Sequence, residues 1–195
     1  VRAAFNVSQA YTDYREMLAD PAIDVVSVVT MWDQHVEPTV AALDAGKHVF
    51  LEKPMASTVA DCDRIIDAAG RSRGSLMVGH VCRFNPRYVA AKQEIDAGRI
   101  GKIVAIYARR NLPTWITAGV LDKIGPIIGD GVHDTDLMLW YTGAKIVSAY
   151  AQTTRVRNLK YPDIGMSMYR FDSGAIAINE NNWALPERSP MQIDE

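Results

Sequence analysis

The sequence predicts an α/β chain in which a doubly wound parallel sheet is followed by a domain built on antiparallel strands. Strand-like apolar runs at residues 23–30 and 48–52 alternate with helical patterns, which is typical of right-handed crossovers between parallel strands. After residue 80, strand-like segments follow one another without intervening helices, which indicates antiparallel pairing. Asp-Ser-Gly at residues 172–174 supports a hairpin turn between two of these later strands.

In the first domain, strands and helices are expected to alternate in chain order. We expect helices at 11–20, 33–47 and 57–72, and strands at 23–30, 48–52 and 75–80. The first and last of these strands contain too few polar residues for a half-exposed strand, so we expect both to be fully buried. The pattern changes at about residues 80–86, without a flexible linker. We therefore expect two domains, at 1–82 and 83–195.

The second domain is expected to begin with a connecting helix that ends near Gly98. Residues 102–110 alternate like a strand with one exposed face, and a helix is expected at 131–142. The three further strand candidates lie at 145–156, 165–171 and 175–183.

The composition is that of a globular protein without a nucleic-acid or membrane partner. Of the 195 residues, 48% are hydrophobic, and the formal net charge is -2, which gives no basic footprint for nucleic acid or for an anionic membrane surface. No apolar run approaches the ~20 residues of a membrane span. Cys62 and Cys82 have no metal-ligand spacing, so we expect reduced thiols in a cytoplasmic protein. The chain begins at Val1, and we expect it to be cut at both ends.

Polar residues gather where the predicted parallel strands end. The strand ends carry Thr30, Met31, Trp32 and His35, then Glu52, Lys53 and Pro54, and then Gly79 and His80. Ligands of open parallel sheets bind beyond the carboxyl ends of the strands, so Lys53 is expected at a cofactor or substrate crevice. The proline that follows favours an extended Lys53. A lone lysine at a strand end is more often a solvated charge, and that alternative stays open.

A second group of candidate residues lies in "GDGVHDTD", residues 129–136. His133 stands among Asp130, Asp134 and Asp136 at the start of the predicted helix. Carboxylates in a first turn are commonly capping or dipole partners. A carboxylate beside a histidine can also fix its tautomer and raise its basicity, as a general base requires. We expect no metal here, because no cysteine or second histidine lies nearby.

At these residues the sequence resembles the Gfo/Idh/MocA family of NAD(P)-dependent oxidoreductases. The segments that carry the resemblance are "AALDAGKHVFLEKPMA", "VGHVCRFNPRYVAAKQEIDAGRIGKI" and "GVHDTDLMLWYTG". The likeness runs from about residue 11 to 183. It implies the second half of a Rossmann-type parallel sheet, followed by an α+β domain with an open-faced, mainly antiparallel sheet. It also implies a homodimer or homotetramer formed through that sheet.

The resemblance assigns roles to particular residues. Lys53 is implied beside the nicotinamide and the substrate hydroxyl, and His133 as the acid/base. The family's substrate-binding aspartate falls on Gly129, so Asp130 is the nearest replacement and is the third catalytic candidate. The expected contacts of NAD or NADP are Thr30, Met31, Trp32, His35, Glu52, Lys53, His80 and Arg83. Arg83 has the alternative of holding the domains together through a carboxylate.

The implied reaction is hydride transfer between a nicotinamide and a secondary alcohol of a sugar or cyclitol. We expect Lys53 and His133 to face each other across one cleft between the two lobes. Two alternatives stay open, an NAD-dependent glycosidase of the same family and a non-catalytic dimerising fragment. The second is motivated by the lack of the family's G-x-G-x-x-G turn, whose helix N-terminus would hold the pyrophosphate.

Overall fold

The computed structural model describes residues 4–117, 119–120 and 123–189. The chain forms two compact units, Val1–Gly79 and His80–Glu195. This division lies a few residues before the domain limits expected from the sequence. None of the helices in the described part of the chain has the length and apolar composition that a membrane span requires.

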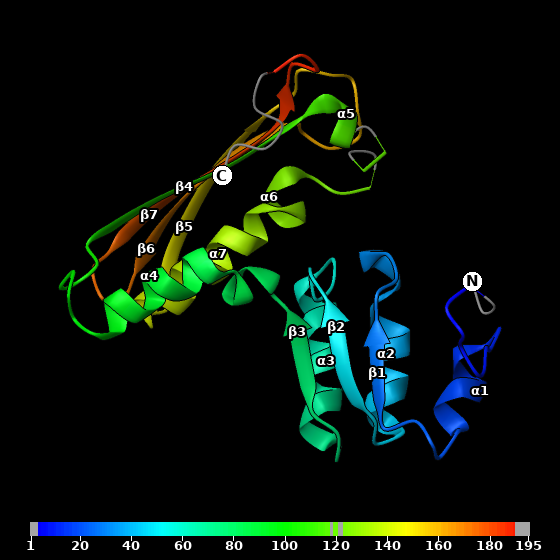
Figure 1. The fold of residues 1–195 in the computed structure, drawn as a ribbon. Coiled ribbons are helices and arrows are strands. Elements are labelled where there is room, and N and C mark those ends of the chain that lie inside the picture. Colours follow the sequence, from blue (N-terminus) through cyan, green and yellow to red (C-terminus); the bar gives the residue numbers. More distant parts are fainter. Residues whose placement is uncertain (1–3, 118, 121–122, 190–195) are drawn as a thin grey trace. The chain divides into compact units, whose positions relative to one another are not determined.

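The first unit is a three-stranded parallel sheet with helices in its crossovers (Figure 1). Its elements are α1 (Tyr14–Ala19), β1 (Val25–Val28), the 3-10 helix η1 (Trp32–Gln34), α2 (Val36–Asp44), β2 (His48–Glu52), α3 (Val59–Arg71) and β3 (Leu76–Gly79). The strand order is β1-β2-β3, and both pairs are parallel. The parallel sheet expected from the sequence is confirmed.

The helix starts of this unit follow from local side-chain caps. α3 begins after Thr58, whose hydroxyl oxygen accepts a hydrogen bond from the backbone N–H of Asp61. For α2, the sequence predicted a start at an Asp33 cap, and this prediction is wrong. Residues 32–34 form the 3-10 helix η1, and α2 begins only at Val36, after His35. Gly46, in the left-handed region at φ 75°, follows the end of α2.

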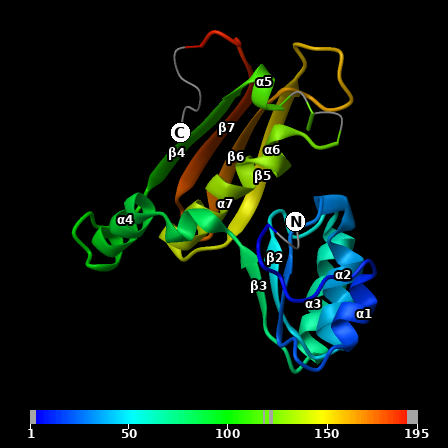
Figure 2. The same ribbon diagram turned by 45° about the vertical axis from the view of Figure 1, so that its right-hand side comes forward.

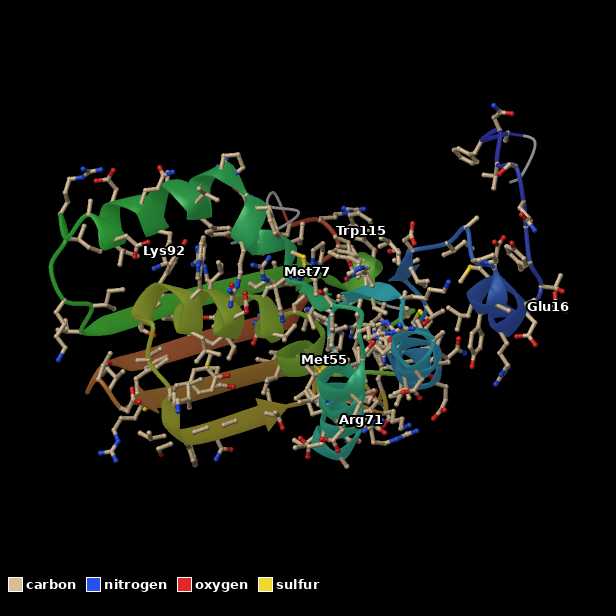
Figure 3. All side chains as sticks on the ribbon, turned by 90° about the horizontal axis from the view of Figure 1, so that it is seen from below. Glu16, Met55, Arg71, Met77, Lys92 and Trp115 are labelled. Carbon is tan, nitrogen blue, oxygen red and sulfur yellow. The ribbon has the colours of Figure 1, made fainter. Side chains whose placement is uncertain are left out.

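The core of the first unit lies between the sheet and α2 and α3, which lie on the same side of it (Figure 2). Leu43, Leu51 and Ile65 are completely buried there. The expectation that the flanking strands are buried on both faces is wrong for this unit. Val25 is 63% exposed and Met77 is 46% exposed, because their side chains point to the face opposite the two helices. Met77 is labelled in Figure 3.

The second unit is built on a mixed four-stranded sheet of order β4-β7-β6-β5. Its elements are the 3-10 helix η2 (Val81–Phe84), α4 (Pro86–Asp96), β4 (Ala105–Pro113), α5 (Thr114–Thr117), α6 (Pro126–Gly129), α7 (Gly131–Thr142), β5 (Ile146–Thr154), β6 (Ile164–Phe171) and β7 (Ile176–Leu185). β4 pairs with β7 in parallel, whereas β5, β6 and β7 pair antiparallel. The expected fold class is confirmed, including the hairpin turn between β6 and β7.

One face of this sheet packs against α7, and the other is open. Met138 of α7 packs on Tyr169, Phe171 and Ala177 of the sheet in a small core. On β6 and β7 the residues between these buried positions are exposed, as in a sheet with one solvated face. α7 therefore holds its first turn against one end of the sheet, where the second group of candidate residues lies.

Candidate functional site

The parallel register of the first unit brings three strand ends to one edge of the sheet. Val28 of β1 pairs with Leu51 of β2, and Glu52 pairs with Gly79 of β3. The segments after β1 and β2 therefore start from the same edge, as expected for a ligand-binding position. Lys53 follows β2 directly and is half-buried.

The backbone around Lys53 is fixed by its neighbours. The Lys53–Pro54 peptide bond is cis, and Pro54 is buried. One carboxylate oxygen of Glu52 accepts a hydrogen bond from the Lys53 backbone N–H at 2.9 Å. The Glu52 side chain thus turns back onto the chain, and its role within this unit is to hold the backbone at Lys53.

His35 lies behind this edge and connects two of its loops. Its ring is only 1% exposed. The Nδ1 atom is 2.9 Å from the carbonyl oxygen of Pro54, and Nε2 is 3.0 Å from the carbonyl oxygen of Thr30. A ring buried between two backbone carbonyls presents neither nitrogen to a ligand. The expectation of His35 as a cofactor contact is therefore corrected, because His35 holds the segments after β1 and β2 together.

The three residues that follow β1 have different surroundings. The Thr30 hydroxyl donates to the carbonyl oxygen of Gln34 at 3.2 Å, Met31 is 37% exposed and Trp32 is half-buried. A cavity of about 630 Å³ runs along β1 and is lined by Thr30 and Gln34 together with apolar residues of α1, β1 and α2. Lys53 is not part of that lining. The cavity thus lies beside β1, whereas Lys53 lies at the end of β2.

In the second unit, His133 lies in the first turn of α7 and is 7% exposed. Its Nδ1 atom is 3.6 Å from the Sγ atom of Cys82 in η2. Both residues line a cavity of about 460 Å³, with Arg110 and Tyr88 among its other walls. His133 is thus buried among protein groups and also borders a volume that a small molecule can enter, as a general base requires.

Two arginine–aspartate pairs involve carboxylates that follow His133 in α7. The Arg110 guanidinium on β4 donates to both carboxylate oxygens of Asp134, at 3.2 and 3.1 Å, and both side chains are buried. Arg83 of η2 donates to both oxygens of Asp136, each at 2.7 Å. This hydrogen bonding to Asp136 raises the pKa of Arg83. These pairs fix α7 against β4 and η2 and thereby orient the helix turn that carries His133.

Arg83 and His80 were both expected to contact the cofactor. The structure instead directs the Arg83 guanidinium to Asp136, within a single unit, so a carboxylate partner accounts for its position. His80 also approaches that carboxylate, with Nδ1 3.9 Å from Oδ2 of Asp136. Asp136 therefore links the start of the second unit to α7.

Asp130 is held by a tryptophan of β7. The indole N–H of Trp183 donates to Oδ2 of Asp130 at 2.8 Å. The same indole leaves no room for a side chain at Gly129, where an added Cβ would stand 2.4 Å from the Cη2 atom of Trp183. The substrate-binding aspartate that the resemblance places at 129 therefore has no space there. Asp130 stays a predicted substrate contact, and its carboxylate does not cap α7.

Sequence reasoning did not assign a role to Cys82, Arg110 or Trp183. The alternation of side chains along β4 places Arg110 on the same face as Ile106 and Ala108, which pack towards α7. This alternation could have predicted an inward-facing Arg110. The contacts of Cys82 and Trp183 join positions 51 and 53 residues apart, and no local pattern reports them. Within residues 4–117, 119–120 and 123–189, no group of three potential ligands could hold a metal ion.

Comparison with known families matches both units. Residues 1–80 match the family model described as "Oxidoreductase family, NAD-binding Rossmann fold". Residues 88–194 match the "GFO/IDH/MocA C-terminal domain". The resemblance identified in the sequence is therefore confirmed.

Similar proteins include enzymes that act on inositols. The chain is 34% identical over 157 residues to inositol 2-dehydrogenase 2 of Saccharopolyspora erythraea, covering 80% of this chain and 46% of that protein. It is 34% identical to inositol 2-dehydrogenase/D-chiro-inositol 3-dehydrogenase of Lactiplantibacillus plantarum, covering 87% and 49%. The structure of scyllo-inositol dehydrogenase from Lactobacillus casei with NAD(H) and scyllo-inositol superimposes with a TM-score of 0.84 at 24% identity, covering 95% and 58%. The chain thus spans about half the length of the curated relatives it matches. It belongs to the Gfo/Idh/MocA family of oxidoreductases.

Proposed function

We propose that the chain is an NAD(P)-dependent oxidoreductase that transfers a hydride between the nicotinamide and a secondary alcohol of a cyclitol or a related sugar. The observation that carries this proposal is the support of Lys53 at the carboxyl edge of the parallel sheet. Glu52 binds the Lys53 backbone N–H, and His35 binds the Pro54 carbonyl next to it. Such support fits a cation that must meet a reacting oxygen at a fixed place.

The residues at this edge fit the nicotinamide end of the cofactor. Carboxyl ends of parallel strands are where nucleotides bind in open α/β sheets. The Thr30 hydroxyl oxygen can accept a hydrogen bond there, Lys53 supplies a cation for the reacting oxygen, and the partly exposed Met31 and Trp32 supply apolar contact surface. The bound nicotinamide would accept the hydride.

Proton transfer is assigned to His133 and charge stabilisation to Lys53. The Nδ1 atom of His133 faces Cys82, so Nε2 is the nitrogen that we assign to the substrate hydroxyl. The Lys53 ammonium stabilises the alkoxide that develops as the proton leaves. This electrostatic stabilisation is stronger in a site with little water than in bulk solvent. The arginine–aspartate pairs keep the His133 turn in place during this step.

A cyclitol is the favoured substrate class because two relatives at 34% identity are named as inositol dehydrogenases. The cavity beside His133 also carries groups suited to several hydroxyls. Its lining includes Arg110, Asn85 and Tyr88, which can donate hydrogen bonds, and the Asn85 amide oxygen and Tyr88 hydroxyl can also accept them. Asp130 is proposed as a further hydroxyl acceptor.

The test is the formation of reduced nicotinamide by the full chain. We expect absorbance at 340 nm to rise with NAD or NADP and at least one of myo-, scyllo- or D-chiro-inositol, and to stay flat in the His133→Asn variant. No reduction with any inositol or common aldose would contradict the proposal. Cleavage of a nitrophenyl glycoside that needs NAD but forms no net NADH would favour the glycosidase alternative instead.

We further propose that the open face of the second sheet binds a second copy of the chain. Tyr107, Ile178, Met168 and Tyr150 stand opposite one another across the four strands. Their exposed fractions are 61%, 38%, 51% and 63%. A continuous apolar row of this kind is typical of an interface. A self-complementary sheet face suits a two-fold dimer.

Sedimentation velocity tests this association. We expect a dimer or tetramer for the chain and a smaller species for Met168→Glu, which places a carboxylate in the middle of the row. Ile66→Glu is the matched control, since Ile66 is 53% exposed on α3 of the first unit. A monomeric wild-type chain, or equal masses for both variants, would contradict the proposal.

A further inference from the structure

The two cysteines of the chain have opposite electrostatic surroundings. Cys62 lies on α3, where burial and the nearby Asp63 and Asp61 raise the pKa of its thiol. Cys82 lies on η2 of the second unit and contacts a histidine and an arginine. A thiol reacts through its thiolate form, which negative neighbours disfavour and positive neighbours favour. The chain therefore offers a comparison between two thiols with different neighbours.

Two polar groups from different elements approach the Cys82 sulfur. The Nδ1 atom of His133 on α7 is 3.6 Å from Sγ, and Nη2 of Arg110 on β4 donates to Sγ at 4.0 Å. An imidazole nitrogen at this distance can take the thiol proton, and a guanidinium N–H stabilises the resulting thiolate. The pairing of a thiol with an adjacent imidazole is the usual way of activating a cysteine nucleophile.

Two titratable groups near this pair, Asp134 and Tyr141, are compatible with that arrangement. Asp134 shares the Arg110 guanidinium, which donates to both of its carboxylate oxygens, so the arginine is held in place while part of its charge is balanced. Burial, with further contributions from Tyr88 and Cys82, raises the pKa of Tyr141 to about 12. The Tyr141 hydroxyl is therefore neutral near pH 7 and adds no negative charge beside the sulfur.

The sulfur borders a volume that a small reagent can enter. Cys82 is half-buried and lines the cavity of about 460 Å³, together with Phe84, Pro86 and Tyr88. Arg110 and His133 line it as well, but the Arg110 charge is balanced by Asp134, so the cavity suits a small molecule without net charge. The thiol is thus both activated by its neighbours and reachable.

We propose that Cys82 is a modification site for small, uncharged, soft electrophiles, with His133 as the base that activates the thiol. In the reaction with iodoacetamide, the Cys82 sulfur attacks the methylene carbon and a sulfur–carbon bond forms. The carbon–iodine bond breaks and iodide leaves. The thiol proton passes to Nδ1 of the His133 tautomer that carries its own proton on Nε2, whereas turnover uses the tautomer protonated on Nδ1. The product is a thioether that fills part of the cavity next to the histidine. On the proposed function, this modification also stops turnover, because His133 is the assigned base.

The test compares the two thiols in the same molecule. The full chain is treated with limiting iodoacetamide at pH 7, and alkylation of each cysteine is followed by peptide mass spectrometry. We expect Cys82 to react several-fold faster than Cys62, because a guanidinium favours the thiolate at Cys82 whereas burial and nearby aspartates disfavour it at Cys62. His133→Asn should slow Cys82 alkylation several-fold and leave the Cys62 rate unchanged.

Two results would overturn the proposal: Cys62 reacting as fast as Cys82, or Cys82 alkylation unaffected by His133→Asn when the Cys62 rate shows that the fold is intact. If that variant does not fold, the wild-type rates decide alone. The alkylation rates do not depend on catalysis. If the chain shows no dehydrogenase activity but Cys82 is alkylated fast, the modification site is supported and only the proposed function is contradicted.

Discussion

The Nδ1 atom of the buried His35 imidazole lies 2.9 Å from the carbonyl oxygen of Pro54, which can only accept a hydrogen bond. Its other nitrogen lies 3.0 Å from the carbonyl oxygen of Thr30. A neutral imidazole carries one N–H, so it donates to one of these carbonyls at a time, and a protonated ring donates to both. One buried side chain therefore couples the two loops that follow β1 and β2, including the loop that carries Lys53.

Replacing His35 by alanine should destabilise the first unit by about 2–3 kcal/mol, because a buried ring and its hydrogen bond to a backbone carbonyl are removed. His48→Ala is the control. His48 is exposed and its ring only accepts the Ser75 backbone N–H, so we expect a loss below about 1 kcal/mol. Urea unfolding followed by circular dichroism measures both. Equal midpoints for the two variants would contradict the role of His35.

The Arg83–Asp136 pair should contribute measurably to stability, whereas the surface pair of Arg64 and Glu37 should not. Arg83→Met removes both hydrogen bonds from a carboxylate whose side chain is 10% exposed, at a cost of about 1.5–3 kcal/mol. Arg64→Met breaks a pair with exposed fractions of 52% and 69%, at less than about 1 kcal/mol. Thermal unfolding at pH 7 compares them. Equal losses of stability in the two variants would mean that the Asp136 carboxylate finds hydrogen-bond donors without Arg83.

Gly129 should tolerate no side chain while Trp183 is present. Gly129→Ala forces a Cβ to within 2.4 Å of the Trp183 ring and should cost about 1–3 kcal/mol. Gly70→Ala is the control, since a Cβ at Gly70 on α3 meets nothing within 4 Å and should stabilise the helix by about 0.5–1 kcal/mol. In a Trp183→Ala background the cost of Gly129→Ala should vanish. Strictly additive losses would show that the indole is not the obstacle.

Glu180 should make stability depend on pH in the acidic range. Hydrogen bonds from Tyr107 and Asn111 lower the pKa of Glu180 from its ordinary value of 4.5. A lowered folded-state pKa stabilises the fold above pH 4.5, and this contribution is lost as the pH falls through the lowered value. Glu180→Gln should therefore be less stable than the wild type at pH 7, with a difference that shrinks as the pH falls below 4.5 and through the lowered pKa of Glu180.

Tyr107→Phe provides the matched control for this prediction, because it removes the largest cause of the Glu180 shift. Both variants should flatten the same part of the curve of unfolding free energy against pH. The double variant should lose no more than Glu180→Gln alone. A difference between Glu180→Gln and the wild type that stays constant down to pH 3 would refute this account.

The sequence predicted best where local signals were strong. β2 occupies residues 48–52 and α7 occupies 131–142, as expected, because each carries a clear periodicity and α7 stops at Gly143, in the left-handed region at φ 59°. The strand-end position of Lys53 was also predictable, since parallel pairing alone brings the strand ends to one edge. The start of α2 was not, because a 3-10 helix replaced the first turn expected at Asp33.

The partners of the site residues could not be predicted. His35 reaches the carbonyl of Pro54 across 19 positions, and Arg110 reaches Asp134 across 24. Such contacts follow from how loops and helices pack, which no short segment of sequence records. The alternation of side chains along β6 and β7, which produces the open face, is visible in the sequence. The exposure of Val25 and Met77 is not, because it depends on which face of the first sheet α2 and α3 cover.

Turnover of the Lys53→Ala variant tests the central claim most directly. With an inositol and NAD, we expect kcat to fall about 100- to 1000-fold, the usual cost of removing a group that stabilises a developing oxyanion. The dissociation constant for NADH, measured by nicotinamide fluorescence, should change by less than about threefold, since this role predicts no large loss of ground-state cofactor binding. An unchanged kcat in Lys53→Ala would contradict the assignment of Lys53 and the reaction proposed for the chain.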